Sequence, residues 1–110
     1  MPERRGASRI PVNLTARYTS DTLTLSGKVA NLSRHGLFLL SEFVDQEGSK
    51  ACVSIDLPES GGELHLTGQV VRLEGDETTG GMGIRFHRLA QSARCQLANF
   101  MIEKSYLSAT

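Results

Sequence analysis

Most of the chain reads as short β-strands, because apolar and polar residues alternate along it in brief runs. Alternation of this kind places apolar side chains on one face of a strand and polar side chains on the other. The first two runs cover residues 12–18 and 23–31, and Ser20 and Asp21 between them favour a turn. The pattern therefore predicts a β-hairpin near the start of the chain.

Four further strand-like runs follow, separated by polar, acidic and glycine-rich segments. They cover residues 37–40, 52–57, 63–72 and 81–86. The first of these four is apolar throughout, which predicts a short buried strand. The last has glycine at alternate positions, which suits a tightly curved strand. Six strands at this spacing predict a mainly β fold, a small six-stranded antiparallel β-barrel.

Only in the C-terminal segment does the spacing of apolar residues change from that of a strand to that of a helix. From residue 89 or 92 onward, apolar residues recur at helical spacing, so an α-helix is expected there, with one stripe able to cap an open end of the barrel. The stripe consists of Ala93, Leu97, Phe100, Met101 and Leu107.

The same helix carries a second apolar strip roughly opposite the first, at Cys95, Ala98, Ile102 and Tyr106. One helix packed on a barrel buries only one broad face. One interpretation is that loops or a fraying helix end cover this strip. The sharper hypothesis is that Cys95, Ile102 and Tyr106 form a surface for self-association or for docking a partner protein.

Size and composition fit one small domain. The chain has 110 residues, of which 39% are hydrophobic, which suits a single core. Apolar runs are short and no cleavable leader is apparent, so neither membrane insertion nor secretion is expected and the predicted location is cytoplasmic. Cys52 and Cys95 lack a CxxC spacing and are expected to be reduced.

The net charge of zero conceals an asymmetry. Residues 1–36 contain six basic and two acidic residues, whereas residues 41–80 contain two basic and nine acidic residues. A general nucleic-acid binder is expected to have a basic domain with interleaved aromatic residues, but this chain has no Trp. The distribution favours a small anionic ligand near the N-terminus over a nucleic-acid polymer.

Two short motifs carry the candidate chemistry. The first is the cluster of Arg4, Arg5 and Arg9, in a segment (1–11) without apolar periodicity that we expect to be a flexible arm. Arginine can bind phosphate or the O6 and N7 atoms of guanine in bidentate fashion, and it can stack on a purine. By itself such an arm is equally typical of a solvated tail or a nonspecific nucleic-acid contact.

The second motif is Asn31-x-Ser33-x-x-Gly36. It supplies an amide, a hydroxyl and a glycine that permits close backbone approach, and so it could form a polar floor for a ligand. The same composition is also that of an ordinary turn, in which short polar side chains bond to nearby backbone.

Together the motifs resemble the RxxxR and (D/N)xSxxG signatures of the PilZ domain, the bacterial receptor module for the dianionic second messenger cyclic di-GMP. The run 81–86 is similar to the family's Gly-x-Gly-hydrophobic-x-Phe strand, which precedes a C-terminal helix. The resemblance covers nearly the whole chain and implies a PilZ β-barrel over 12–110, with the helix from about 89.

By position, the resemblance implies that Arg5 and Arg9 contact the phosphate and guanine of cyclic di-GMP, and that Asn31, Ser33 and Gly36 face the other side of the nucleotide. An arginine just before RxxxR accompanies binding of an intercalated cyclic di-GMP dimer in this family, which implies a further stack or phosphate contact for Arg4. Some members place a Trp on the strand beside the site, where this chain has Val70 and Val71.

No catalytic constellation is expected. His35, His65 and His87 are far apart in the sequence, and no HExxH or CxxC motif accompanies them, so neither an enzyme nor a metal site is predicted. The leading hypothesis is a stand-alone cyclic di-GMP effector, without a further cofactor, that changes conformation and signals through an unidentified effector protein or a homodimer, as in motility or biofilm regulation. The alternatives are a nucleotide-independent adaptor of the same fold and, more distantly, a small nucleic-acid-binding barrel.

Overall fold

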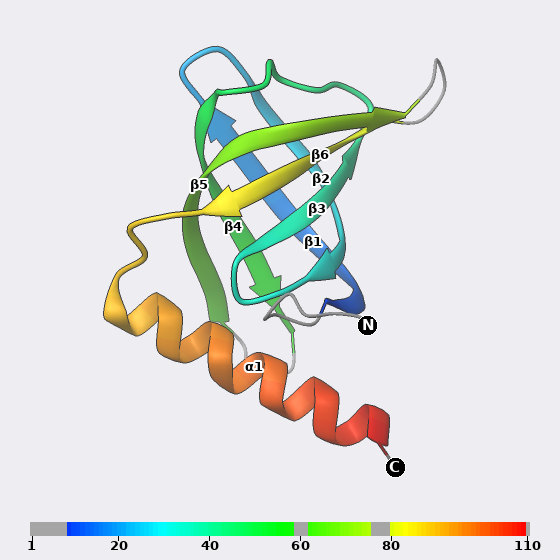
Figure 1. Ribbon diagram of the computed structural model, residues 1–110, viewed down its shortest axis with the longest axis vertical. Coiled ribbons are helices and arrows are strands. Elements are labelled where there is room, and N and C mark those ends of the chain that lie inside the picture. The colour runs from blue at the N-terminus through cyan, green and yellow to red at the C-terminus, as the bar shows by residue number, and fades with distance from the viewer. Residues whose placement is uncertain (1–8, 59–61, 76–79, 110) are drawn as a thin grey trace, which may run out of the picture.

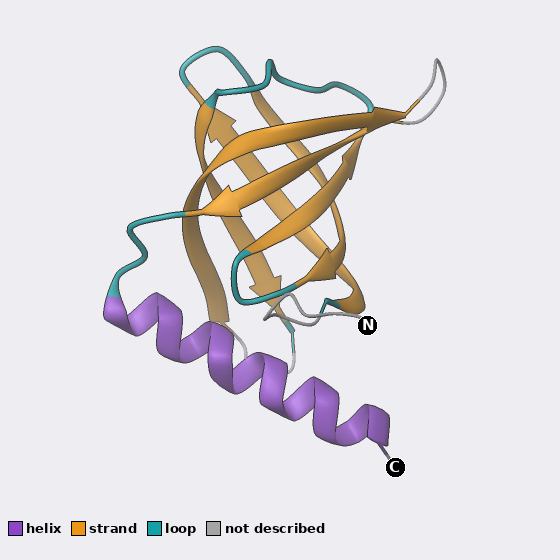
Figure 2. Cartoon of the chain, in the orientation of Figure 1, coloured by secondary structure: helices purple, strands orange, loops and turns teal. Residues whose placement is uncertain are grey.

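Six antiparallel strands close into a barrel, and a helix follows them (Figures 1 and 2). The computed structural model describes residues 9–58, 62–75 and 80–109, with side chains through residue 104. The elements are β1 (Ile10–Ser20), β2 (Thr24–Leu32), β3 (Gly36–Ser41), β4 (Lys50–Leu57), β5 (Gly62–Gly75), β6 (Gly80–Phe86) and α1 (Gln91–Ala109). Around the barrel the order is β1-β2-β3-β6-β5-β4, and β4 pairs back with β1. The predicted architecture is therefore confirmed.

The barrel core follows the predicted alternation. On β1, for example, Leu14, Ala16 and Tyr18 are buried and the residues between them are exposed. The run on β3 behaves differently from the expectation of a wholly buried strand. Leu40 is 44% exposed on the outer face, whereas Phe38, which shares that face, is only 9% exposed. Another group must therefore cover the Phe38 ring from outside the barrel.

Helix α1 lies across one end of the barrel, next to β5 and β1 (Figure 1). Its residues Ala93, Leu97 and Phe100 are buried in the core, and Met101 packs against them. The predicted capping stripe is thus confirmed, except at Leu107, whose side chain lies outside the described residues.

The second strip of α1 is exposed at two of its three described positions. Cys95 is exposed, Ile102 is 65% exposed and Ala98 is half-buried, while the side chain of Tyr106 lies outside the described residues. The exposure fits the docking hypothesis, which stays a prediction.

At the opposite end of the barrel, the loop between β3 and β4 is tied down by Asp45. Its carboxylate accepts hydrogen bonds from the hydroxyls of Tyr18 (2.7 Å), Ser20 (2.5 Å) and Thr22 (3.0 Å), and its backbone N–H contacts the sulfur of Met82 (3.3 Å). The hydroxyl donors, Ser20 first, lower the pKa of Asp45 to about 2, because they favour the ionised form. Burial, followed by the hydrogen bond to Asp45, raises the pKa of Tyr18 above its ordinary value. The loop is therefore held by a buried and charged hydrogen-bond hub.

Candidate ligand-binding site on the barrel wall

The turn between β2 and β3 is built around Ser33. The buried Ser33 hydroxyl accepts hydrogen bonds from the backbone N–H groups of His35 (3.1 Å) and Gly36 (3.2 Å), and the Ser33 N–H donates to the Gly36 carbonyl (2.9 Å). Local side-chain bonding of this kind stabilises a tight turn. In this structure Ser33 therefore shapes the turn, as the simpler interpretation of the motif expected, and a ligand contact by its hydroxyl remains a prediction.

Gly36 is required by a close backbone approach. A Cβ atom at this position would stand 2.3 Å from the carbonyl oxygen of Ile84 on β6, so no larger residue fits without a shift of the strand. Gly36 thus sets the distance between the turn and β6.

Arg9 and Asn31 join the two sequence motifs. Arg9 Nη1 donates a 2.6 Å hydrogen bond to Asn31 Oδ1, although 22 positions separate them. The antiparallel pairing of β1 with β2 brings them together, since Pro11 lies opposite Asn31. Asn31 is half-buried and Arg9 is exposed. Arg4 and Arg5 lie outside the described residues.

The strand register extends this site across the outer wall of the barrel. Asn31 on β2 lies opposite Phe38 on β3, Phe38 opposite Gly83 on β6, and Gly83 opposite Arg72 on β5. Neighbouring strands are about 4.8 Å apart, so the row spans roughly 14 Å. A second row on the same face places exposed Arg85 opposite Gly36.

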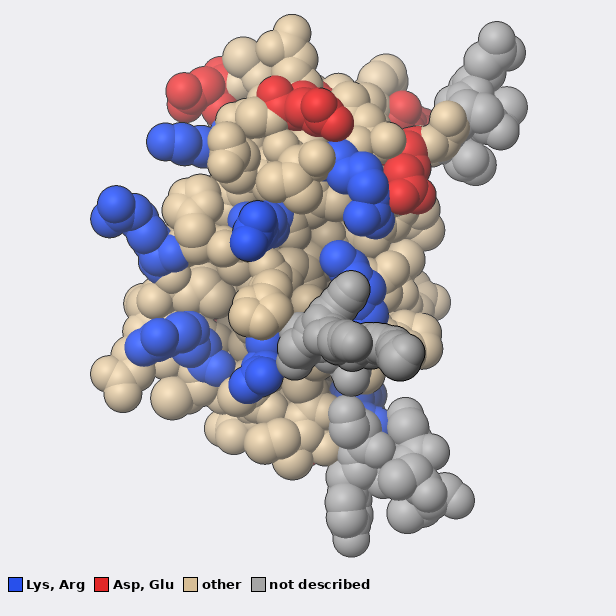
Figure 3. Space-filling model, viewed as in Figure 1, with Lys and Arg blue, Asp and Glu red and all other residues tan. Residues whose placement is uncertain are grey.

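Basic side chains gather on this wall. In Figure 3 the strands β3, β6 and β5 face the viewer. Lys and Arg residues are spread over the middle of this face, and Asp and Glu residues lie mainly towards the end formed by the β3–β4 loop. According to the strand register, Arg72 and Arg85 lie on this surface, which we call the basic wall. The sequence motifs did not include them, because only strand pairing places them beside Asn31 and Gly36.

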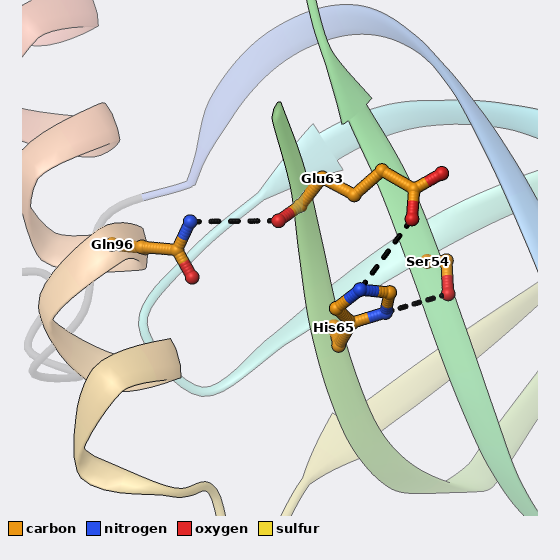
Figure 4. Close-up of polar contacts among 4 residues, drawn as sticks. All are labelled: Ser54, Glu63, His65 and Gln96. Carbon is orange, nitrogen blue, oxygen red and sulfur yellow. Dashed lines mark hydrogen bonds and ion pairs between the residues drawn. The ribbon is translucent and has the colours of Figure 1, made fainter. Parts of the chain in front are cut away.

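A hydrogen-bonded string of Ser54, His65 and Glu63 lies on another part of the wall (Figure 4). The Ser54 hydroxyl is 3.0 Å from His65 Nδ1, and His65 Nε2 is 3.4 Å from Glu63 Oε1. The order resembles that of a catalytic triad, but direct cross-strand pairing of Ser54 with His65 accounts for it. The side chains of His65 and Glu63 are 70% and 47% exposed, and the adjacent depression, of about 50 Å³, is too small for a substrate.

Other candidate sites are of a different kind. A cleft of about 460 Å³ lies between α1 and the barrel end, lined by Val12, Leu57 and Phe100 among others. Within residues 9–58, 62–75 and 80–109, no three His, Cys, Asp or Glu side chains are grouped so that they could hold a metal ion. Over the same residues, no helix is long and apolar enough to cross a membrane. The basic wall is therefore the strongest candidate for an anionic ligand.

Comparison with known families settles the class of the domain. The family model described as PilZ domain matches residues 3–103, and thus both motifs and most of α1. The chain belongs to the PilZ domain family. A search among curated proteins finds no match. PilZ domains are binding and adaptor domains rather than enzymes, and several members bind c-di-GMP (cyclic di-GMP).

Solved structures share the fold of this PilZ domain. The PilZ domain of Escherichia coli YcgR, solved with c-di-GMP, superposes with a TM-score of 0.76 at 19% identity, over 96% of this chain and 95% of that one. The Bacillus subtilis inhibitor of motility MotI/DgrA gives 0.80 at 18% identity, over 96% of this chain and 53% of that one. The MrkH–c-di-GMP complex of K. pneumonia gives 0.80 at 12% identity, over 98% and 55%. The chain thus spans about half the length of MotI and MrkH, and at these identities the likeness concerns the fold.

Proposed function

We propose that this PilZ domain binds cyclic di-GMP on the basic wall beside Arg9 and Asn31. The observation that carries the proposal is the 2.6 Å hydrogen bond from Arg9 to Asn31, which unites the two ligand-binding motifs of the family on one surface. Asn31 holds one nitrogen of the guanidinium and leaves the other donors of the exposed Arg9 available. Those donors can take a phosphate oxygen or the O6 and N7 atoms of guanine.

The remaining arginines would complete the grip. Arg4 and Arg5 precede Arg9 by a few positions, so ligand binding could draw them onto the wall. Two phosphates and two bases offer enough acceptors for several guanidinium groups, and closing the arm would cost conformational entropy. This closure is the conformational change by which the domain would report the ligand.

The signal then leaves by contact with a protein partner. The exposed strip of α1, with Cys95 and Ile102, is the surface that we assign to this contact. A conformational change transmits a signal only if a partner protein binds differently to the two conformations. Exposed apolar side chains on a helix are suited to binding such a partner. A homodimer would use the same surface.

Isothermal titration with cyclic di-GMP tests the binding proposal. The wild-type domain should bind, and Arg5→Ala and Arg9→Ala should each lower the affinity by roughly ten- to a hundredfold, because loss of a charge-assisted hydrogen bond costs about 1.5–3 kcal/mol. Arg17→Ala is the matched control. Arg17 is an exposed arginine on β1 that lies opposite Ser26 on β2 and Ser54 on β4, away from the basic wall. Wild-type affinity in both variants would show that the site is elsewhere. No binding by the wild type would favour the nucleotide-independent adaptor.

A further inference from the structure

On the basic wall, two outward-facing positions of β6 are glycines. Gly81 and Gly83 both face outward and both are buried. The Phe38 ring comes within 2.5 Å of the place where a Cβ atom of Gly81 would stand, and Arg72 comes within 3.3 Å of the corresponding place at Gly83. Side chains at these two positions would push both groups away from the strand. The glycines therefore let Phe38 and Arg72 lie flat against the barrel.

Arg72 covers Phe38. The Arg72 Cζ atom is 5.5 Å from the centroid of the Phe38 ring, a distance at which a cation is attracted to an aromatic face. This contact explains why Phe38 is only 9% exposed although it points outward. The Arg72 side chain itself is 48% exposed. The basic wall thus carries a guanidinium, that of Arg72, which lies over the Phe38 ring and is partly open to solvent.

The open guanidinium lies within reach of the motif residues. Phe38 is the direct cross-strand neighbour of Asn31, and Arg72 leans over Phe38 from the far side of β6. The side chain thereby shortens the distance between β5 and Asn31, which would otherwise be three strand spacings. A ligand held by Arg9 and Asn31 and extending over β3 would meet Arg72.

Glu74 restrains the same guanidinium. Both residues face outward on β5, opposite Gly81 and Gly83, and Arg72 Nε is 2.6 Å from Glu74 Oε2. The side chain of Glu74 is 53% exposed. Its carboxylate neutralises Arg72 and occupies one of its donors, so a phosphate or the acceptor edge of a guanine has to compete with it.

We propose that Arg72 is a further ligand-contacting residue of this domain, stacked on Phe38 and held back by Glu74. The inference rests on the proposed binding of cyclic di-GMP and adds a restraint on its affinity. In the free protein Arg72 is paired with Glu74, and in the complex it turns its free face and donors to a guanine or phosphate. The pairing thus sets the affinity below the value that the arginines alone would give.

Titrations of single and double variants with cyclic di-GMP test this arrangement. Arg72→Ala should weaken binding about tenfold, and Arg72→Lys should restore little, because an ammonium lacks the planar stacking surface. Glu74→Gln should tighten binding by up to about fivefold, the range of an exposed ion pair. In an Arg72→Ala background, Glu74→Gln should have no effect, because the two residues act as a unit. Arg17→Ala serves as the control for loss of an exposed arginine, and thermal melts test whether each variant remains folded.

Three results would overturn the inference. If Arg9→Ala loses binding and Arg72→Ala does not, the ligand stays on the near side of Phe38, and the proposed function stands without this contact. If Glu74→Gln tightens binding equally with and without Arg72, Glu74 acts as a general repulsive charge and not as a restraint on Arg72. If the wild-type domain does not bind cyclic di-GMP at all, the proposed function fails, and the role of Arg72 fails with it.

Discussion

At Gly36 the barrel leaves no room for a side chain. The carbonyl oxygen of Ile84 occupies the space that a Cβ atom would need, while Ser33 fixes the turn that leads into this position. The glycine of the second motif is thus explained by backbone packing, whatever it contributes to a ligand.

Replacing Gly36 by Ala should therefore destabilise the fold. Overpacking at a close contact costs about 1–3 kcal/mol, which should appear as a lower midpoint in thermal or urea unfolding. Gly62→Ala is the matched control, because a Cβ atom at Gly62 on β5 would have no neighbouring atom within 4 Å and the backbone there has no positive φ. Equal stability of the two variants would contradict the close approach of β3 and β6.

The carboxylate of Asp45 should make stability depend on acid. Its pKa is lowered from 3.8 to about 2 in the folded protein, so its contribution is fully present above pH about 4 and is lost as the pH falls towards 2. Asp45→Asn should cost about 1–3 kcal/mol at neutral pH and should lose part of the wild-type dependence on pH in that acidic window. Urea unfolding between pH 2 and pH 7 measures both effects. Asp56→Asn, at an exposed position of β4, should leave the profile close to that of the wild type.

The two faces of α1 differ in burial. The face with Leu97 is buried against the barrel, and the face with Ile102 is exposed. Because the apolar spacing alone is similar on both faces, packing against β5 and β1 is what distinguishes them.

Ile102→Asp should leave folding and cyclic di-GMP binding intact and should disrupt self-association or partner docking. The physical reason is that a carboxylate at a contact surface must be desolvated on association, whereas at an exposed position of the free protein it remains hydrated. Analytical ultracentrifugation and circular dichroism measure the two properties. Leu97→Asp is the opposing control and should unfold the domain. Unfolding by Ile102→Asp as well would mean that the strip is part of the core.

Across the whole molecule, charge is sorted by place. Lys and Arg residues are spread over the middle of the face on which β3, β6 and β5 lie (Figure 3), whereas Asp and Glu residues lie mainly towards the end with the β3–β4 loop and Glu74 pairs with Arg72 on β5. A domain with zero net charge can therefore attract an anionic ligand locally, since exposed charges act over about 10 Å at ordinary salt.

If Arg4 supports an intercalated ligand dimer, the wild-type domain should bind close to two cyclic di-GMP molecules per chain. Arg4→Ala should then lower the stoichiometry towards one while binding is retained, because the second nucleotide loses a stacking or phosphate partner. Calorimetry at high protein concentration gives the number directly. A wild-type stoichiometry of one would remove this role from Arg4.

The secondary-structure elements and the family could be predicted from the amino-acid sequence alone. Periods of two and of 3.6 residues are local properties, and they were sufficient to predict six strands, the helix and its buried stripe at Ala93, Leu97 and Phe100. The two motifs were likewise readable, because each consists of residues close together in the chain, and the family model spans both.

The contacts between those residues depend on how the strands pair in the folded barrel. Closure of the barrel and the register of its strands brought Arg9 to Asn31, placed Arg72 and Arg85 on the same wall, and turned Ser33 inward. It also covered Phe38 and exposed Leu40 on one strand that is apolar throughout. Strand pairing between distant segments depends on the packing of the whole barrel, and a local pattern holds no information about the partner across the sheet.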